Sequence, residues 1–192
     1  MNINSRRYLG NKYKLLPFIT ATAKRHCPGI ESVADIFAGT GSVAYNFIGK
    51  RLITNDILYS NYICHLAWFS PEQADFAKIE SILQFYNAAE AKEDNYMSIN
   101  FSGTYFSRSV CRKIGFIREH IEGIYARHEI NSRERAILIT SLLYAMDKIA
   151  CTCGHYDAYR KNASLPETIC FLITIWLKKE MGAQTQEFMT RT

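Results

Sequence analysis

The sequence predicts an α/β fold in which a parallel sheet carries a mainly helical insertion. Short apolar runs at residues 32–37 and 51–56 alternate with stretches of helical periodicity, which is the order typical of parallel βαβ units. Helical patterns then dominate residues 57–150. The 192 residues are 48% apolar and 21% charged, as expected for a globular domain rather than a disordered chain.

The elements of the first half follow from apolar periodicity and from turn residues. A stripe of Leu15, Leu16, Ile19 and Ala23 predicts the first helix, and the Cys27-Pro28-Gly29 turn ends it. In chain order we expect a helix over 12–26, a buried strand over 32–37, a glycine loop, a helix over 42–50 capped by Ser42, a strand over 51–56, a helix from near Ser60, and another with Ser70 as cap and Pro71 at its first position.

The second half is predicted to be helical between irregular segments. Residues 93–107 are expected to be irregular, 107–128 to form a basic amphipathic helix, and 132–150 to form a largely buried one. A loop follows over 151–166. The predicted organisation is a cofactor-binding α/β part at 1–92, a helical insertion at 93–166 and a tail at 167–192.

Charge is unevenly distributed along this chain of net charge +5. Residues 1–30 hold six Lys or Arg and no acid, and residues 107–135 hold seven against four acids. Two basic stretches suit a polyanionic partner, although solvated helix faces would give the same pattern. No run of eighteen apolar residues and no signal peptide are evident, so we expect a cytoplasmic protein. The six cysteines lack disulfide spacing and are expected to be free thiols.

The glycine loop lies between a predicted strand and a predicted helix, which is the setting of nucleotide-binding loops. Gly39 and Gly41 allow tight turning and close approach of a ligand. Asp56 ends the second strand 17 residues after Gly39, roughly where dinucleotide folds place a ribose-binding acid. The loop lacks the third glycine of GxGxxG and has no GK[ST], so S-adenosylmethionine fits better than a dinucleotide or a P-loop ligand. An ordinary tight turn remains the alternative.

Three motifs in this order resemble those of adenine-specific DNA methyltransferases of restriction-modification type. They are "RYLGNKYKLLPFI" at 7–19, "DIFAGTGSVA" at 35–44 and "TND" at 54–56. The segments "YFSRSVCRKIGFIREHIE" and "CTCGHYDAYRK" extend the resemblance to about residues 5–162. The resemblance implies a Rossmann-like sheet, S-adenosylmethionine as methyl donor, double-stranded DNA as substrate and a possible restriction endonuclease partner.

The resemblance also implies roles for individual residues. Lys12 would lie near the carboxylate of the cofactor, where a point cation is favourable. Asp56 would hold the ribose. The remaining residues of the predicted cofactor site are Tyr8, Gly10, Asn11, Asp35, Phe37, Ala38, Gly39, Thr40 and Gly41.

Two basic segments are candidates for DNA contacts. Cations at spacings of four to six on the helix over 107–128 can track a phosphate backbone, and aromatic residues beside cations can stack on a displaced base. For the helix, the alternative is an ordinary solvated face. For the loop, the alternative is that His155 and Tyr156 only hold it against the sheet. The predicted DNA-binding residues are Arg108, Arg112, Lys113, Arg118, His155, Tyr156, Tyr159, Arg160 and Lys161. Cys151, Cys153 and His155 lack a fourth ligand at a zinc spacing, so we predict no metal site.

The catalytic tetrapeptide of the resembled family, [DNS]-P-P-[YFW], is absent, because no two of the four prolines (17, 28, 71 and 166) are adjacent. Residues 167–192 contain no family motif, and we hypothesise that a frameshift or premature stop near residue 166 made them an aberrant tail. No catalytic residue is therefore assigned, and this chain is expected to be an inactive fragment. A methyltransferase for another substrate class and a non-catalytic nucleic-acid-binding module remain alternatives.

Overall fold

The computed structural model describes residues 3, 12–153, 156, 158–160, 164–170 and 189–190. Residue contacts divide the chain into two compact units. Unit 1 holds the described residues up to Gln73 together with strand β3 (Met189–Thr190), and unit 2 holds those from Ala74 to 170. The sequence-based division places a boundary after residue 92, whereas the contacts change at Gln73. That functional division stays a prediction.

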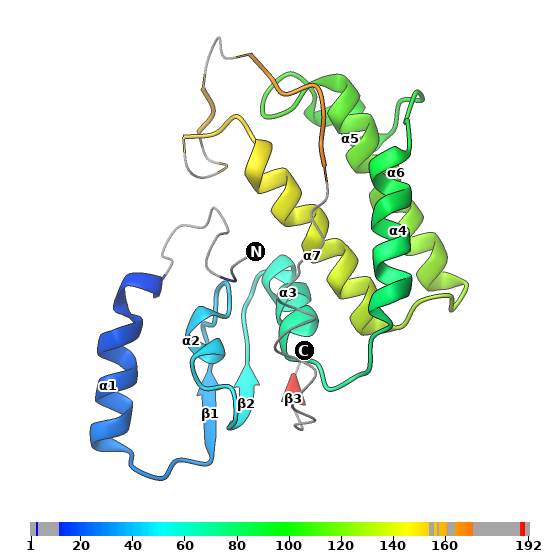
Figure 1. Cartoon of the computed structure of the whole chain (residues 1–192). Coiled ribbons are helices and arrows are strands. Elements are labelled where there is room, and N and C mark those ends of the chain that lie inside the picture. Colours follow the sequence, from blue (N-terminus) through cyan, green and yellow to red (C-terminus); the bar gives the residue numbers. More distant parts are fainter. Residues whose placement is uncertain are drawn as a thin grey trace. The chain divides into compact units, whose positions relative to one another are not determined.

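Unit 1 contains a parallel sheet, which confirms the predicted α/β class at the level of a small parallel sheet with helices. Strands β1 (Ser32–Asp35) and β2 (Arg51–Thr54) pair in the register Ser32 with Arg51 and Asp35 with Thr54. Strand β3 pairs with the other edge of β2, so the described strands lie in the order β1-β2-β3 (Figure 1).

The predicted helix over 12–26 begins as a 3₁₀ helix over Lys12–Leu15 and becomes α1 only at Leu16–His26. Pro17 explains the position of the α-helix, because a proline is tolerated in the first turn but not further inside. Leu16 is buried, whereas Leu15 is 55% exposed, so the predicted apolar stripe is only partly buried.

Three other predictions about unit 1 were wrong in detail. Strand β1 is exposed or half-buried along its length, because β2 is its only partner among the described strands. Helix α2 (Ser42–Tyr45) is one turn long, and Gly41 in the left-handed region precedes it, so Ser42 is not its cap. Helix α3 (Tyr59–Phe69) begins close to the predicted Ser60, but Ser70 ends it instead of starting the next helix.

Unit 2 is helical, with α4 (Phe76–Ala88), α5 (Tyr96–Phe101), α6 (Arg108–Ala126) and α7 (Ser132–Ile149). Asp75 is the cap of α4, since its carboxylate accepts hydrogen bonds of 3.0 Å from the amides of Ala77 and Lys78. Helix α5 was missed, because six residues carry little periodicity. Its capping box of Asn95 and Ser98 was the available signal.

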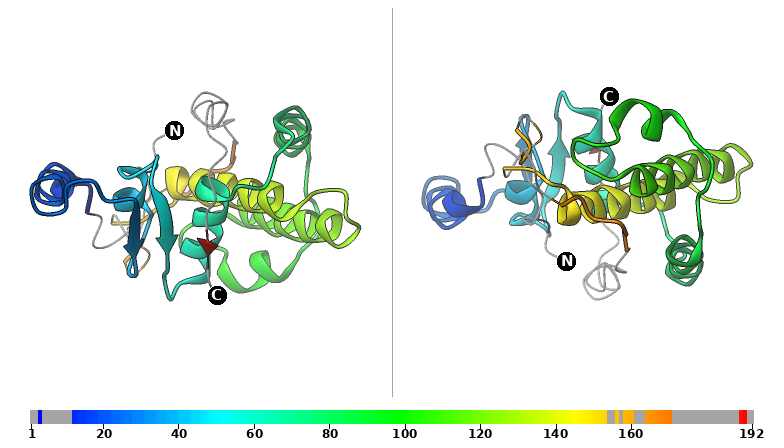
Figure 2. Two further views of the ribbon diagram at one scale, coloured as in Figure 1. Left: turned by 90° about the horizontal axis from the view of Figure 1, so that it is seen from below. Right: turned by 90° about the horizontal axis from the view of Figure 1, so that it is seen from above.

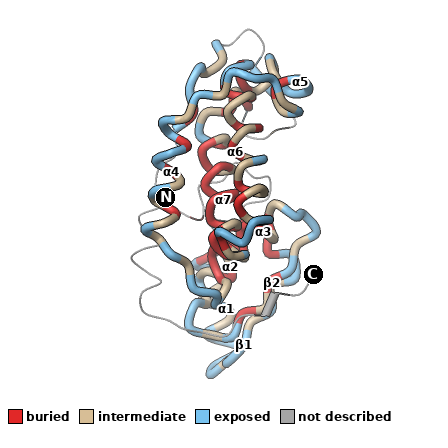
Figure 3. The backbone as a smooth tube through the Cα atoms, turned by 90° about the vertical axis from the view of Figure 1, so that its right-hand side faces the viewer, coloured by how far each residue is buried: buried red, intermediate tan, exposed pale blue. Residues whose placement is uncertain are grey.

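Helices α6 and α7 form the core of unit 2 and lie side by side in both views of Figure 2. Their buried positions make a nearly continuous band in Figure 3. The buried carboxylate of Glu134 accepts from the backbone amides of Asp75 and Asn131 and pairs with Lys78 at 2.7 Å. These contacts join the start of α4 to the start of α7, so α4 packs with the helices of unit 2. In the described residues no helix is long and apolar enough to cross a membrane.

Candidate functional site

The glycine loop joins the carboxyl end of β1 to α2. Its backbone is fixed by hydrogen bonds from Ala38 N to Asn55 O (3.0 Å) and from Gly41 N to Ala38 O (2.8 Å). Gly39 and Gly41 both have positive φ, at 55° and 81°. The loop therefore has the two left-handed positions that the Gly-x-Gly spacing indicates.

Asp56 contacts this loop directly. Its Oδ2 accepts from the amide of Gly39 at 2.8 Å, while Oδ1 accepts from the amide of Leu58 at 2.9 Å and from Asn61 Nδ2 at 3.0 Å. Burial tends to raise the pKa of Asp56, but the three hydrogen bonds lower it below its ordinary value, so the carboxylate is ionised at neutral pH. Since a carboxylate has about four acceptor positions, one on Oδ2 remains for a ligand.

Asp35 differs from Asp56 in that its pKa is raised above the ordinary value. Burial raises its pKa, although the charges of Lys12 and His65 and a backbone hydrogen bond from Phe37 oppose this. Its Oδ2 is buried and has no hydrogen-bond partner in the described part of the chain. A buried acceptor without a partner is costly, so this oxygen is suited to a donor brought by a ligand.

The remaining described residues of the predicted cofactor site also gather at the loop. Lys12 Nζ donates to the carbonyl of Phe37 at 2.8 Å, which leaves two of its three donor positions available. The Phe37 side chain is 74% exposed, whereas Ala38 and Thr40 are buried. The structure thus brings together Lys12, Asp35, Phe37, Ala38, Gly39, Thr40, Gly41 and Asp56, while Tyr8, Gly10 and Asn11 lie outside the described residues.

Sequence reasoning missed two polar residues of α3 that contact the site. Asn61 donates to Asp56, and His65 Nε2 lies 2.9 Å from the carbonyl of Gly39. Their spacing of four residues on a predicted helix just after the acid was the available signal.

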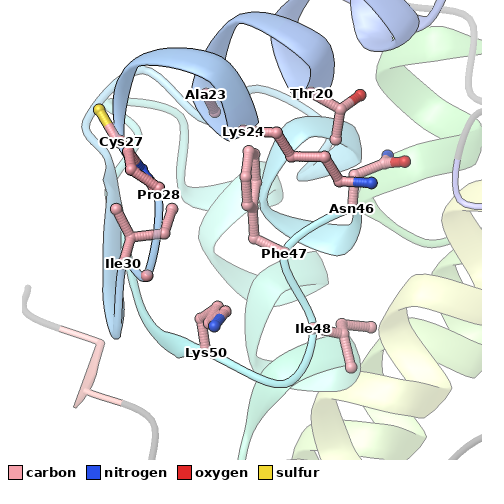
Figure 4. A pocket seen from close by; sticks show the side chains of 11 residues that line it. Thr20, Ala23, Lys24, Cys27, Pro28, Ile30, Asn46, Phe47, Ile48 and Lys50 are labelled. Carbon is pink, nitrogen blue, oxygen red and sulfur yellow. The ribbon is translucent and has the colours of Figure 1, made fainter.

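A separate pocket of about 300 Å³ lies at the opposite end of the strands (Figure 4). Its walls come from α1, from the turn before β1 and from the segment between α2 and β2. None of the predicted cofactor residues lines it. The glycine loop is therefore not part of this cavity.

The predicted DNA-binding cations of α6 have partners within unit 2. Arg108 and Arg112 both pair with Asp94, the latter at 2.7 Å, and these hydrogen bonds lower the pKa of Asp94. Lys113 Nζ donates to the carbonyl of Asn87 at 2.9 Å, and Arg118 pairs with Glu122. Acidic and carbonyl oxygens of the same unit therefore satisfy part of the charge of these cations, and their role in DNA binding stays a prediction.

The loop after α7 is held by backbone and tyrosine contacts. Thr152 and Tyr159 form an antiparallel bridge, and Cys153 N donates to Ala158 O at 3.1 Å. Tyr156 donates to Asp147 at 3.1 Å, which is the arrangement expected of a residue that pins a loop. Tyr159 is partly exposed.

Arg160 belongs to the same segment, and its amide donates to Cys151 O, whereas His155 and Lys161 lie outside the described residues. All six cysteines are free thiols. Within the described ranges, no group of three His, Cys, Asp or Glu side chains is placed to hold a metal ion.

Gly41→Ala is expected to damage the loop more than Gly29→Ala does. Both glycines have similar positive φ values, of 81° and 76°. A Cβ at Gly41 would lie 3.1 Å from Phe69 Cε2 and 3.3 Å from His65 Cδ2, whereas a Cβ at Gly29 would meet nothing within 4 Å. Backbone strain alone costs about 1–2 kcal/mol at either site. Thermal unfolding should show a larger loss for Gly41→Ala, and equal losses would contradict the crowding described.

The structure has a small parallel sheet with a glycine loop after one strand and an acid after the next, which makes it an α/β protein. Comparison with models of known protein families identifies the family to which the chain belongs. The family model for D12 class N6 adenine-specific DNA methyltransferases matches residues 8–177. The chain belongs to this family, and the resemblance read from the motifs is confirmed. The match extends past residue 162, where the motif resemblance ends, and includes residues 167–177 of the predicted tail.

Curated relatives are modification methylases. The chain is 32% identical to modification methylase LlaI of Lactococcus lactis subsp. lactis over 168 residues, covering 81% of this chain and 27% of the relative. It is 31% identical to modification methylase StsI of Streptococcus sanguinis over 172 residues, covering 81% and 26%. It is 28% identical to type II methyltransferase M.NlaIII of Neisseria lactamica over 165 residues, covering 81% and 49%. The chain thus spans about a quarter of the first two relatives. No solved structure gave a significant match.

Proposed function

We propose that this chain is the S-adenosylmethionine-binding part of a site-specific DNA adenine-N6 methyltransferase that acts in the cytoplasm, beside a cognate restriction endonuclease. Family membership implies a methyl donor. The observation that favours S-adenosylmethionine is the buried Oδ2 of Asp35, which has no partner within the described residues. An ammonium group can satisfy such an oxygen, and the amino-acid end of S-adenosylmethionine carries one.

The other residues of the loop fit the rest of this cofactor. Lys12 has donor positions available for its carboxylate, and Asp56 Oδ2 has an acceptor position for one ribose hydroxyl. Bound S-adenosylmethionine would supply the methyl group for transfer. The residues of this chain would bind and orient it, and the acceptors that hold the target amine would come from the catalytic motif that the chain lacks.

Cofactor binding tests this proposal without requiring turnover. Equilibrium dialysis with labelled S-adenosylmethionine should show saturable binding that S-adenosylhomocysteine displaces and that ATP and NAD do not. Displacement by NAD would favour a dinucleotide site instead. Saturable binding with no affinity for DNA would favour the alternative of another methyl-acceptor class.

The DNA-binding residues of α6 also form part of the proposal. Asp94→Asn should strengthen non-specific DNA binding several-fold, because it releases Arg108 and Arg112 from their carboxylate partner. Each additional phosphate contact should steepen the dependence of log affinity on log salt by about 0.9. Fluorescence anisotropy with a labelled duplex over a salt series measures both quantities.

Glu129→Gln is the matched control, since it makes the same change in net charge and removes only the partner of Arg127. If Asp94→Asn and Glu129→Gln change affinity and salt dependence equally, the effect is one of net charge. The face of α6 with Arg108 and Arg112 would then not be the contact surface.

A further inference from the structure

One face of α3 is directed at the cofactor loop. Asn61, His65 and Phe69 are spaced four residues apart, so they lie on one side of the helix, and each is no more than 1% exposed. Asn61 donates to Asp56 and His65 contacts Gly39, while Phe69 Cε2 lies 3.1 Å from the position that a Cβ on Gly41 would take. Each residue thus contacts a different part of the loop or its acid.

The contact of His65 defines the proton position on its ring. Its Nε2 lies 2.9 Å from the carbonyl oxygen of Gly39, and a carbonyl oxygen only accepts, so Nε2 carries the hydrogen. Burial lowers the pKa of His65, which keeps the ring neutral at pH 7. His65 is therefore a neutral donor to the loop.

Both polar groups of Gly39 are held by side chains. Asp56 Oδ2 accepts from its amide at 2.8 Å, and His65 donates to its carbonyl. In a trans peptide the C=O and the following N–H point in opposite directions. With the Gly39 carbonyl directed at α3, the Thr40 amide points away from α3.

We propose that His65 is a positioning residue for the cofactor loop, and that its hydrogen bond to Gly39 sets the loop conformation that binds S-adenosylmethionine. Asn61 has the same role for Asp56, because its donated hydrogen bond orients the carboxylate. The inference rests on the proposed cofactor. It adds a polar face of α3 to the cofactor site.

The test compares three variants of the full chain by calorimetric titration with S-adenosylmethionine and by thermal unfolding. His65→Leu removes the donor at similar volume, whereas His65→Gln supplies an amide N–H near the position of Nε2. His120→Leu is the control, since His120 Nδ1 also makes one hydrogen bond, 2.9 Å from Tyr86 OH, but in unit 2. We expect His65→Leu to weaken binding about tenfold or more, as an unsatisfied buried acceptor implies. His65→Gln should stay within about threefold and His120→Leu within about twofold of the unmodified chain.

The outcomes separate this inference from the proposed function. Unaltered affinity in His65→Leu, or a loss that only follows the fall in unfolding temperature across all three variants, would overturn the positioning role. Absence of binding by the unmodified chain would overturn the proposed cofactor and the inference with it.

A second measurement serves if His65→Leu does not fold. With ¹⁵N-labelled histidine in the unmodified chain, the signal of His65 should report the Nε2–H tautomer at pH 7 and shift on addition of S-adenosylmethionine. The Nδ1–H tautomer, or a signal that does not respond, would contradict the proposal.

Discussion

Asp56→Ala is expected to abolish measurable binding of S-adenosylmethionine. The substitution removes the acceptor of Gly39 N, Leu58 N and Asn61, together with the position proposed for a ribose hydroxyl. Hydrogen bonds to a charged group contribute about 1.5–3 kcal/mol each, so losing the ligand contact and the loop contact together should weaken binding by about 100-fold or more. Equilibrium dialysis with labelled cofactor measures the loss.

Asp75→Ala is a suitable control for this variant. It also removes a carboxylate that accepts two backbone amides, but at the start of α4 in unit 2. Loss of a helix cap costs about 1 kcal/mol of stability, and cofactor affinity should not change. Normal binding by Asp56→Ala would show that the acid after β2 does not hold the cofactor.

The chain by itself is expected to bind cofactor without methylating adenine in DNA. Methylation requires an extruded base whose amine is held in place, and the tetrapeptide that does this in the family is absent from the sequence. Incorporation of labelled methyl groups into DNA of mixed sequence should remain at background. Methylation by the chain alone would show that other residues replace the tetrapeptide.

The hypothesis of an aberrant tail at 167–192 can be tested with the coding DNA. Sequencing from codon 160 onward and translating all three frames should reveal a strand ending in the tetrapeptide, and restoring that frame should restore adenine methylation. A continuous frame without the motif would make residues 167–192 genuine sequence. The alternatives of another methyl-acceptor class or a binding module would then gain support.

The motif-bearing part of the site could be predicted from the sequence because its signals are local. The spacing of Gly39, Gly41 and Asp56 reflects a loop and an acid at the ends of adjacent parallel strands, and the structure brings the two within hydrogen-bonding distance. The periodicity of α6 and α7 is strong because both are long and pack against each other. Their observed bounds agree with those predicted to within two residues.

Contacts between distant residues could not be predicted in the same way. Ser70 and Asp75 are both good capping residues, and only the structure shows Ser70 ending α3 while Asp75 caps α4. The pairing of Asp94 with Arg108 and Arg112 likewise depends on α5, a helix too short to show a period. His65 reads as an ordinary helix residue until its contact with Gly39 is seen.

The central claim, that the loop after β1 binds S-adenosylmethionine, is tested most directly by NMR of the chain labelled with ¹⁵N-glycine. The ten glycines give a small set of signals, and Gly115 and Gly123 on α6 serve as internal references. Titration with S-adenosylmethionine should shift the amide signals of Gly39 and Gly41 in a saturable manner and leave those of Gly115 and Gly123 unchanged. Saturable binding that leaves Gly39 and Gly41 unshifted would contradict the account.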